Sequence, residues 1–150
     1  MLDRFQGSLM GLAIGDALGT TVEFQAPGTF VPVTDMSGGG VFNLPKGYWT
    51  DDTSMALCLA ESLIAKNGFD PADQMERYVR WYRSGHLSST GVCFDIGNAT
   101  AEALQQFERT ADPFSGSENP FSAGNGSIMR LAPAALFYSR DLAEAAAWSG

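Results

Sequence analysis

Hydrophobic residues recur along the chain at helical rather than strand spacing. Apolar positions three and four residues apart predict helices over residues 3–19, 53–66, 71–84, 99–109, 128–138 and 142–148. No stretch shows the alternation of apolar and polar residues that a half-buried strand requires. The pattern therefore predicts an all-α fold in which long loops cover residues 20–48 and 111–119.

Local signals mark where two of these helices end and begin. Asn67-Gly68 is a typical helix stop, and Asp70-Pro71 is a strong start, with aspartate as the cap and proline in the first turn. In the helix before the stop, Leu59, Leu63 and Ile64 are predicted to face the core. In the helix after it, one face is predicted to be charged and solvated, and its residues are Glu76, Arg77, Arg80 and Arg83.

The first predicted helix carries a glycine at every fourth position, which places the glycines near one stripe: Gly7, Gly11, Gly15 and Gly19. Because glycine costs roughly 1 kcal/mol per helical position relative to alanine, the stripe predicts close packing of another backbone. Asp16 falls near the end of this helix, where a carboxylate opposes the helix dipole. Its position indicates either a functional residue or a hydrogen bond to a neighbouring loop.

Composition narrows the class of protein. The 150 residues, 45% of them hydrophobic, suffice for one folded domain. The formal net charge of −8 argues against a nucleic-acid backbone or an anionic membrane as partner. Cys58 and Cys93 fit neither a disulfide framework nor a metal-ligand spacing. The sequence also shows no signal-peptide pattern and no apolar run of membrane-spanning length. We therefore expect a cytoplasmic protein. The only histidine, His86, is predicted to be a solvated loop residue.

The segment from Thr50 to Thr53 is the densest cluster of oxygen donors in the chain. Two adjacent carboxylates, Asp51 and Asp52, lie between two threonines just before an apolar helix. These residue types are typical of a helix N-terminal cap. Consecutive carboxylate and hydroxyl oxygens also suit a hard divalent cation such as magnesium. The residues alone leave both interpretations open.

Residues 124–126 form a Gly-Asn-Gly turn ahead of the apolar helix predicted to start at Ile128. Backbone N–H groups at such a helix start can bind a phosphate, although this sequence is also an ordinary turn. Glu23 lies at the start of the long loop that follows the first helix. Loops of this length inside a domain are often functional.

Taken together, these motifs resemble the ADP-ribosylglycohydrolase family. Their order and spacing match over nearly the whole chain, and the combination is far more specific than any single motif. The four matching segments are Gly11–Gly19 followed by Glu23-Phe24, Trp49–Thr53, Asp95–Asn98 and Gly124–Pro133.

The resemblance implies an orthogonal multi-helix fold with two Mg²⁺ or Mn²⁺ ions in a cleft. It maps metal ligands onto Thr50, Asp51 and Asp52. It places Glu23 at the metal centre and Asp95 beside the bond to be cleaved. Either of these two carboxyl groups could be the general base or acid, and the sequence does not choose between them.

The resemblance also implies a substrate and the residues that contact it. The expected activity is metal-dependent hydrolysis of the glycosidic bond between ADP-ribose and a protein side chain or a related acceptor. The partner would be an ADP-ribosylated protein or a small molecule that contains ADP-ribose. Residues expected to face the cleaved bond or to hold the ribose and phosphates are Gly97, Asn98, Gly124, Asn125, Gly126, Ser127 and Met129.

Family members continue beyond the matching segments and complete the metal site with later residues. We therefore expect residues 1–150 to form the N-terminal part of a single such domain, with the second half of the metal ligands absent. The alternative is a catalytically incomplete protein of the same family that binds ADP-ribose or a nucleotide, or serves a structural role. Self-association or a complementing chain would then complete the site.

Overall fold

The computed structural model describes residues 2–122 and 124–149, and these are helices joined by loops. Within this part of the chain there is no strand, only an isolated bridge between Gly39 and Leu44. The predicted all-α class is confirmed. The elements are α1 (Leu2–Gly19), the 3-10 turn η1 (Thr20–Val22), α2 (Asp51–Lys66), α3 (Pro71–Ser84), α4 (Asn98–Thr110), the 3-10 turn η2 (Pro120–Ser122), α5 (Gly126–Met129), α6 (Ala132–Phe137) and α7 (Leu142–Ala147).

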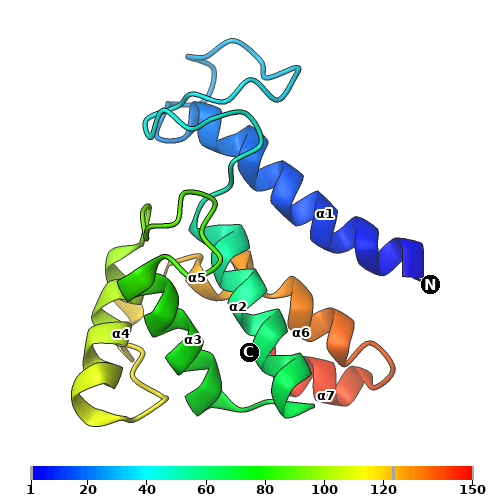
Figure 1. Ribbon diagram of the computed structural model, residues 1–150, viewed down its shortest axis with the longest axis vertical. Helices are drawn as coiled ribbons and strands as arrows, with labels where there is room; N and C mark the ends of the chain where they lie inside the picture. Colours follow the sequence, from blue (N-terminus) through cyan, green and yellow to red (C-terminus); the bar gives the residue numbers. More distant parts are fainter. Residues whose placement is uncertain (1, 123, 150) are drawn as a thin grey trace.

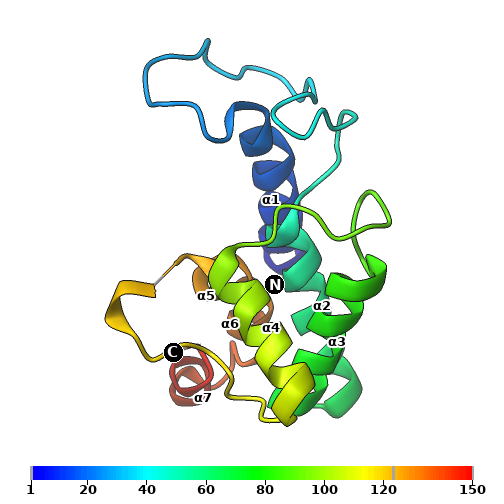
Figure 2. The same cartoon turned by 90° about the vertical axis from the view of Figure 1, so that its left-hand side faces the viewer.

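Helix α2 is the centre of the arrangement. It packs against α3 on one side and against α6 on the other, and α4 packs on the outer side of α3 (Figure 1). Helix α1 contacts α2 and α6 and lies along one edge of the molecule, with the long loop that follows it beyond its end (Figures 1 and 2). An added Cβ at Gly7, Gly11 or Gly15 meets no described atom within 4 Å, so the close packing predicted along the glycine stripe is not met within residues 2–122 and 124–149. None of the described helices combines the length and the hydrophobicity that a membrane-spanning helix requires.

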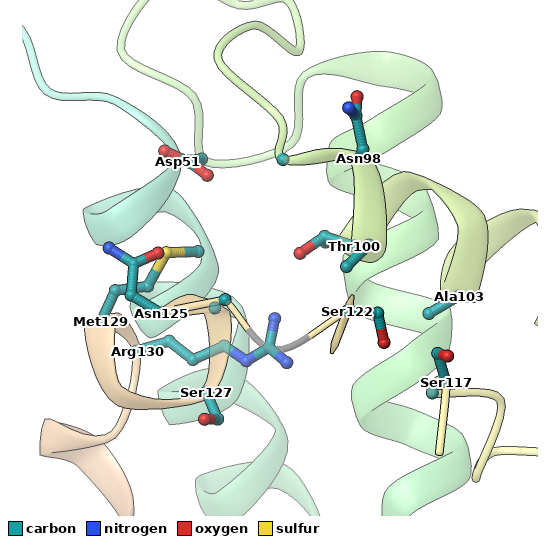
Figure 3. Close-up of a pocket in the computed structure, with 15 residues that line it drawn as sticks. Asp51, Asn98, Thr100, Ala103, Ser117, Ser122, Asn125, Ser127, Met129 and Arg130 are labelled. Carbon is teal, nitrogen blue, oxygen red and sulfur yellow. The ribbon is translucent and has the colours of Figure 1, made fainter. Parts of the chain in front are cut away.

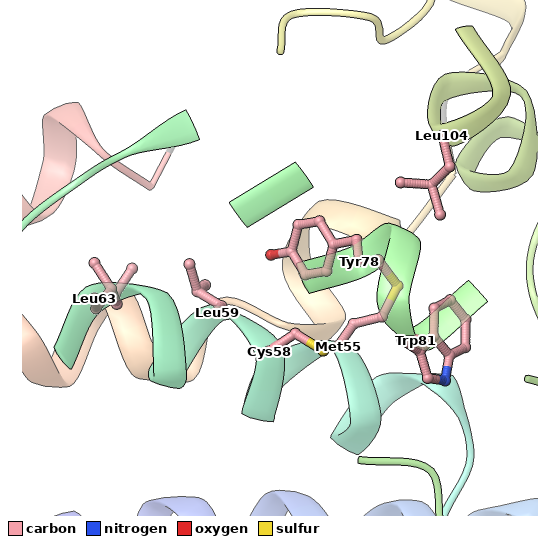
Figure 4. Close-up of a cluster of buried hydrophobic side chains, with 8 residues drawn as sticks. Met55, Cys58, Leu59, Leu63, Tyr78, Trp81 and Leu104 are labelled. Atoms are coloured by element: carbon pink, nitrogen blue, oxygen red, sulfur yellow. The ribbon is translucent and has the colours of Figure 1, made fainter. Parts of the chain in front are cut away.

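The hydrophobic core lies where α2, α3, α4 and α6 meet (Figure 4). Its buried side chains are Met55, Cys58, Leu59, Leu63, Tyr78, Trp81, Leu104 and Ala134. The inward positions predicted for Leu59 and Leu63 are confirmed. The prediction for Ile64 is wrong, because its side chain is 75% exposed on the flank of α2 that faces α1 and α6.

The apolar segment predicted as one helix over residues 128–138 is two short helices. α5 ends at Met129 and α6 begins at Ala132, with Arg130 and Leu131 between them. Pro133 has no N–H for a helical hydrogen bond, so it is tolerated only in the first turn of a new helix. The prediction of a single bent helix is therefore wrong. After the break, α5 borders the cavity described below, whereas α6 contributes to the hydrophobic core.

The loop after η1 is held by a tight turn and by close packing against η1. Gly39 and Leu44 exchange backbone hydrogen bonds across a tight turn. Gly40 has a φ of 67°, and a side chain there would collide with the carbonyl oxygen of Thr20. Glycine at this position thus allows the loop to pack closely against the start of η1.

One part of the face predicted to be solvated is instead an ion-pair network. Arg77 is only 14% exposed, and its guanidinium lies 2.6 Å from Asp73 and 2.9 Å from Glu61. His86, predicted to be solvated, lies with its Nε2 2.8 Å from the same Glu61 carboxylate. Partial burial acts to raise the pKa of the Glu61 and Asp73 carboxyl groups. Hydrogen bonds outweigh this effect, so both pKa values are below their ordinary values: Arg77 donates to Asp73, and His86 and Arg77 both bond Glu61. The network ties α2, α3 and the loop after α3 together.

We expect Arg77→Met to lower the free energy of unfolding by about 2 kcal/mol at pH 7, because two charge-assisted pairs are lost. A carboxyl group whose folded-state pKa is lowered stabilises the fold above its ordinary pKa, and this contribution is lost as the pH falls through the folded value. The difference between the two proteins should therefore shrink toward pH 3. Urea unfolding at both pH values checks this, and a pH-independent difference would contradict it.

Candidate functional site

The N-terminus of α2 is capped by a residue of another helix. Thr50 is the cap position, but its side chain makes no capping hydrogen bond. Instead, the Asp16 carboxylate of α1 accepts hydrogen bonds from the backbone N–H groups of Thr50 and Thr53, both at 3.0 Å, and from their hydroxyls at 2.9 and 2.7 Å. Of the two interpretations left open for Asp16, the hydrogen bond to a neighbouring segment is confirmed. Its negative charge lies at the positive end of the α2 dipole.

This cap orients the predicted metal ligands. The Thr50 hydroxyl donates its proton to Asp16, so its oxygen lone pairs remain free to accept. Asp51 and Asp52 follow as the first residues of α2, and Asp51 is only 7% exposed. The capping and metal interpretations of the Thr50–Thr53 segment are therefore compatible, since Asp16 performs the capping.

Carboxyl groups from four parts of the chain influence one another at this end of α2. Burial raises the pKa of Asp51 from 3.8 to about 7, and the charge of Asp52 adds to the rise. Burial also raises the pKa of Asp52, followed by the charges of Asp16 and Glu23. For Asp95, burial together with the charges of Asp51 and Glu23 raises the pKa to about 8. An excess of negative charge of this kind favours binding of a cation.

Asp95 is held in an uncommon backbone conformation. Its φ is 59°, in the left-handed region that costs most L-residues roughly 1–2 kcal/mol. Aspartate tolerates this region better than most residues because its short polar side chain can bond locally. The turn brings Asp95 toward Asp51 before α4 begins at Asn98.

A cavity of about 310 Å³ lies between the start of α2, the start of α4 and α5 (Figure 3). Asp51 and Thr100 border it from α2 and α4, and Asn125 and Met129 border it from the α5 side (Figure 3). The structure thus brings together predicted site residues from three distant segments. Those that line the cavity are Asp51, Gly97, Asn98, Gly124, Asn125, Gly126, Ser127 and Met129.

The remaining predicted site residues do not line this cavity. Thr50, Asp52, Asp95 and Glu23 lie outside its wall, toward the side where the carboxyl groups influence one another. The side chain of Asn98 points away from the cavity, although its backbone borders it (Figure 3). The site thus has an acidic side with a cavity next to it, and Asp51 belongs to both.

Sequence reasoning missed Arg130, which supplies the only positive charge among the described residues that line the cavity. Its guanidinium lies 4.8 Å from the centre of the Tyr78 ring and 3.5 Å from the Met55 sulfur. These contacts fix the side chain so that the charged group reaches the cavity (Figure 3). The only signal in the sequence was its place directly after Met129 in the fourth matching segment. Polar residues also missed are Thr100, Ser117 and Ser122.

The donor set at the start of α2 suits magnesium or manganese in kind. Thr50, Asp51 and Asp52 offer oxygen atoms only, which these ions prefer. Within residues 2–122 and 124–149, no three His, Cys, Asp or Glu side chains converge closely enough to hold a metal ion. Magnesium usually takes one or two protein carboxylates and completes its shell with water and substrate oxygens. The residues present therefore fit such an ion and leave coordination positions for other ligands.

A family model for ADP-ribosylglycohydrolase matches residues 1–150. The chain belongs to the ADP-ribosylglycohydrolase family. It is 53% identical over 147 residues to the ADP-ribosylarginine hydrolase Tri1 of Pseudomonas putida (strain GB-1), a match that covers 98% of this chain and 39% of that protein. It is 39% identical over 141 residues to the ADP-ribosyl-(dinitrogen reductase) glycohydrolase of Rhodospirillum rubrum, covering 89% of this chain and 44% of that one.

A solved structure agrees with this family assignment. A protein described as an ADP-ribosylglycohydrolase-related protein complex superposes with a TM-score of 0.80 at 51% identity, covering 95% of this chain and 46% of that one. The expected fold family is confirmed. The chain spans about two fifths of the length of the curated relatives named above, 39% of one and 44% of the other.

Proposed function

We propose that this chain provides the acidic cluster and the adjoining cavity of an ADP-ribosylglycohydrolase that removes ADP-ribose from a protein side chain. The observation that supports this most is that Asp51, Gly97-Asn98 and the Gly124–Met129 segment meet at one cavity, with Asp95 close to Asp51. Identity of 53% to an ADP-ribosylarginine hydrolase favours an arginine-linked substrate.

In this proposal, the cavity takes the ADP-ribose and the acidic side takes the bond to be cleaved. The backbone at Gly124–Gly126 and the guanidinium of Arg130 would bind the diphosphate, because both offer hydrogen-bond donors to an anion. This fixes the ribose so that its C1 atom faces the carboxyl groups near Asp51. Water adds to C1 while the bond from C1 to the side-chain nitrogen breaks and that nitrogen receives a proton.

Asp95 and Glu23 remain the two candidates for moving that proton. Burial and neighbouring charges raise the pKa of Asp95 to about 8, so this carboxyl group can both hold and accept a proton near neutral pH. Thr50, Asp51 and Asp52 would hold a magnesium or manganese ion, as the chemistry of their oxygens supports. When bound, that ion would polarise the ribose hydroxyls and lower the pKa of a bound water.

Arg130→Met should weaken the binding of ADP-ribose at least about tenfold, because a charge-assisted bond to phosphate is worth more than 1.4 kcal/mol. Methionine keeps most of the apolar stem over Tyr78. Calorimetric titration of the chain with ADP-ribose in the presence of Mg²⁺ measures the change. Arg140→Met removes a charge from an exposed position outside the cavity and should leave the affinity unchanged. Equal effects of the two substitutions would contradict the assignment of Arg130.

The same titration, followed by an assay for release of ADP-ribose from an arginine-linked substrate, tests the proposed function. Binding together with release supports a hydrolase within this chain. Binding without release favours the alternative of a catalytically incomplete ADP-ribose-binding protein. Absence of ADP-ribose binding to the folded chain would refute both.

A further inference from the structure

The peptide group between Trp49 and Thr50 is hydrogen-bonded at both of its ends. The Ser89 hydroxyl, from the loop between α3 and α4, donates to the carbonyl oxygen of Trp49 at 2.6 Å. The N–H of Thr50 donates to the Asp16 carboxylate of α1 at 3.0 Å. Because a peptide group is planar and rigid, one bond at its oxygen and one at its N–H fix its orientation. Two segments far apart in the sequence thus set the backbone that enters α2.

The two hydrogen bonds on this peptide group also strengthen each other. A hydroxyl that donates to a carbonyl oxygen polarises the amide, which makes the N–H of the same amide a better donor. Here the acceptor of that N–H is a carboxylate, so the contact is charge-assisted. Loss of the Ser89 hydroxyl would therefore weaken the contact between Thr50 and Asp16 as well as its own contact with Trp49.

The loop between α3 and α4 is itself firmly held. It folds back on itself, because Gly85 lies so close to Gly91 that a Cβ at Gly85 would collide with the Gly91 carbonyl. The Nε2 atom of His86 lies 2.8 Å from a carboxylate oxygen of Glu61 in α2. Leu87 has a φ of 60°, which a bulky residue adopts only where its surroundings impose it, and its side chain packs against the hydrophobic core. The loop can therefore support the segment that it contacts.

This loop contacts the start of α2 on both sides of Thr50. Before it, Trp49 is held a second time, because its indole N–H donates to the carbonyl oxygen of Leu87 at 3.3 Å. After it, Asp51 lies close enough to Asp95 of the same loop for its charge to raise the pKa of Asp95. The loop lies beside the first turn of α2 in both views of the molecule (Figures 1 and 2). A change in the loop would thus be felt at the proposed metal ligands.

We infer that Ser89 is a positioning residue of the proposed metal site: by holding the Trp49 carbonyl, it keeps Thr50 in place to bind a divalent cation. The inference rests on the proposed function, in which Thr50 is one of the ligands. Groups that orient a metal ligand from behind contribute to metal affinity nearly as the ligand does. Asp16 is such a group on the N–H side of Thr50, and Ser89 is its counterpart on the carbonyl side. Ser89 does not line the cavity, so it acts through Trp49.

Three variants of the full 150-residue chain test this inference. Ser89→Ala removes the hydroxyl, and Ser89→Thr retains one. Ser88→Ala is the matched control, because it removes a hydroxyl one residue away that contacts Thr90 and not Trp49. The affinity for Mn²⁺, measured from the electron paramagnetic resonance signal of the free ion, should fall about three- to tenfold in Ser89→Ala. In the other two variants it should stay within about twofold of the unsubstituted chain.

Hydrogen exchange of the Thr50 amide is a second readout, and it needs no metal. In Ser89→Ala this amide should exchange about threefold faster or more, because its bond to Asp16 is weakened. The amides in the middle of α2 should keep their rates. This pattern separates a local change at Thr50 from a general loss of stability, which would speed the exchange of all these amides together.

Equal Mn²⁺ affinities of Ser89→Ala and Ser88→Ala would overturn the inference. So would a Ser89→Thr variant that binds Mn²⁺ as weakly as Ser89→Ala, or an unchanged exchange rate of the Thr50 amide in Ser89→Ala. These results leave the proposed function standing, because the unsubstituted chain still binds the ion. If the unsubstituted chain bound no Mn²⁺, the proposed metal site would fail and the inference with it, and faster exchange in Ser89→Ala would then identify Ser89 as a structural contact only.

Discussion

Replacing Asp16 by alanine should destabilise the chain by about 3 kcal/mol. The substitution leaves the N–H groups of Thr50 and Thr53, and both hydroxyls, without their acceptor. Both threonines are buried, so water cannot readily replace the carboxylate. Urea unfolding monitored by far-UV circular dichroism measures the loss.

Asp16→Asn should be nearly as harmful as Asp16→Ala. Both carboxylate oxygens accept hydrogen bonds from N–H or O–H donors, and an amide would direct its own NH₂ group at some of them. Asp141→Ala is the control, because it removes the cap of the exposed helix α7 and should cost about 1 kcal/mol. If Asp16→Asn retained the stability of the unsubstituted chain, the charge and the second acceptor would be unimportant.

Asp51→Asn should have opposite effects on stability and on metal binding. In the metal-free chain, Asp51 is buried beside Asp52, and its pKa is raised from 3.8 to about 7. Each unit by which the pKa rises corresponds to about 1.4 kcal/mol of destabilisation of the charged carboxylate by folding. Asparagine removes this charge, but its buried amide is also polar, so only part of the destabilisation is relieved. We expect the metal-free protein to gain about 2 kcal/mol. Binding of Mg²⁺ or Mn²⁺ should fall at least about tenfold, because a charged oxygen ligand is lost.

Asp35→Asn supplies the comparison for this experiment. Asp35 is exposed, and it pairs only loosely with Lys46, at 3.7 Å. Its neutralisation should change neither stability nor metal affinity noticeably. Parallel thermal unfolding and calorimetric titration of the two variants give both quantities. A loss of stability in metal-free Asp51→Asn would show that the carboxylate is compensated in the native protein and is not poised for a cation.

The features best predicted from the sequence were those that depend on residues close together in the chain. Asp70 caps α3 with Pro71 in its first turn, and Asn67 ends α2 in a left-handed conformation, as local preferences require. Part of the cavity lining, such as Asp51 and Asn125, was named in advance because these residues fall in segments that resemble the family. A helix cap depends on a few neighbouring residues, and a motif is a short stretch of the chain. Both can therefore be recognised in a single sequence.

Contacts between distant segments were harder to predict. Nothing in the helical period distinguishes Arg77, which pairs with Glu61 of α2, from solvated arginines on the same helix. The period also placed Ile64 in the core, although the surface it faces is open. Arg130 lies between two short helices and contacts Tyr78 and Met55, which are distant in the sequence, and a hydrophobic pattern does not encode such contacts.

The position of Asp16 connects α1 to the residues proposed to bind a metal ion at the start of α2. The carboxylate belongs to α1 but holds the first turn of α2, so a rigid shift or rotation of α1 must move Thr50 or break its hydrogen bonds. A ligand or polypeptide that favours one placement of α1 would therefore alter the affinity for a cation at α2. By thermodynamic reciprocity, the cation would alter the affinity for that polypeptide by the same factor. With a metal ion at the proposed site, α1 would thus couple two binding events that share no atom.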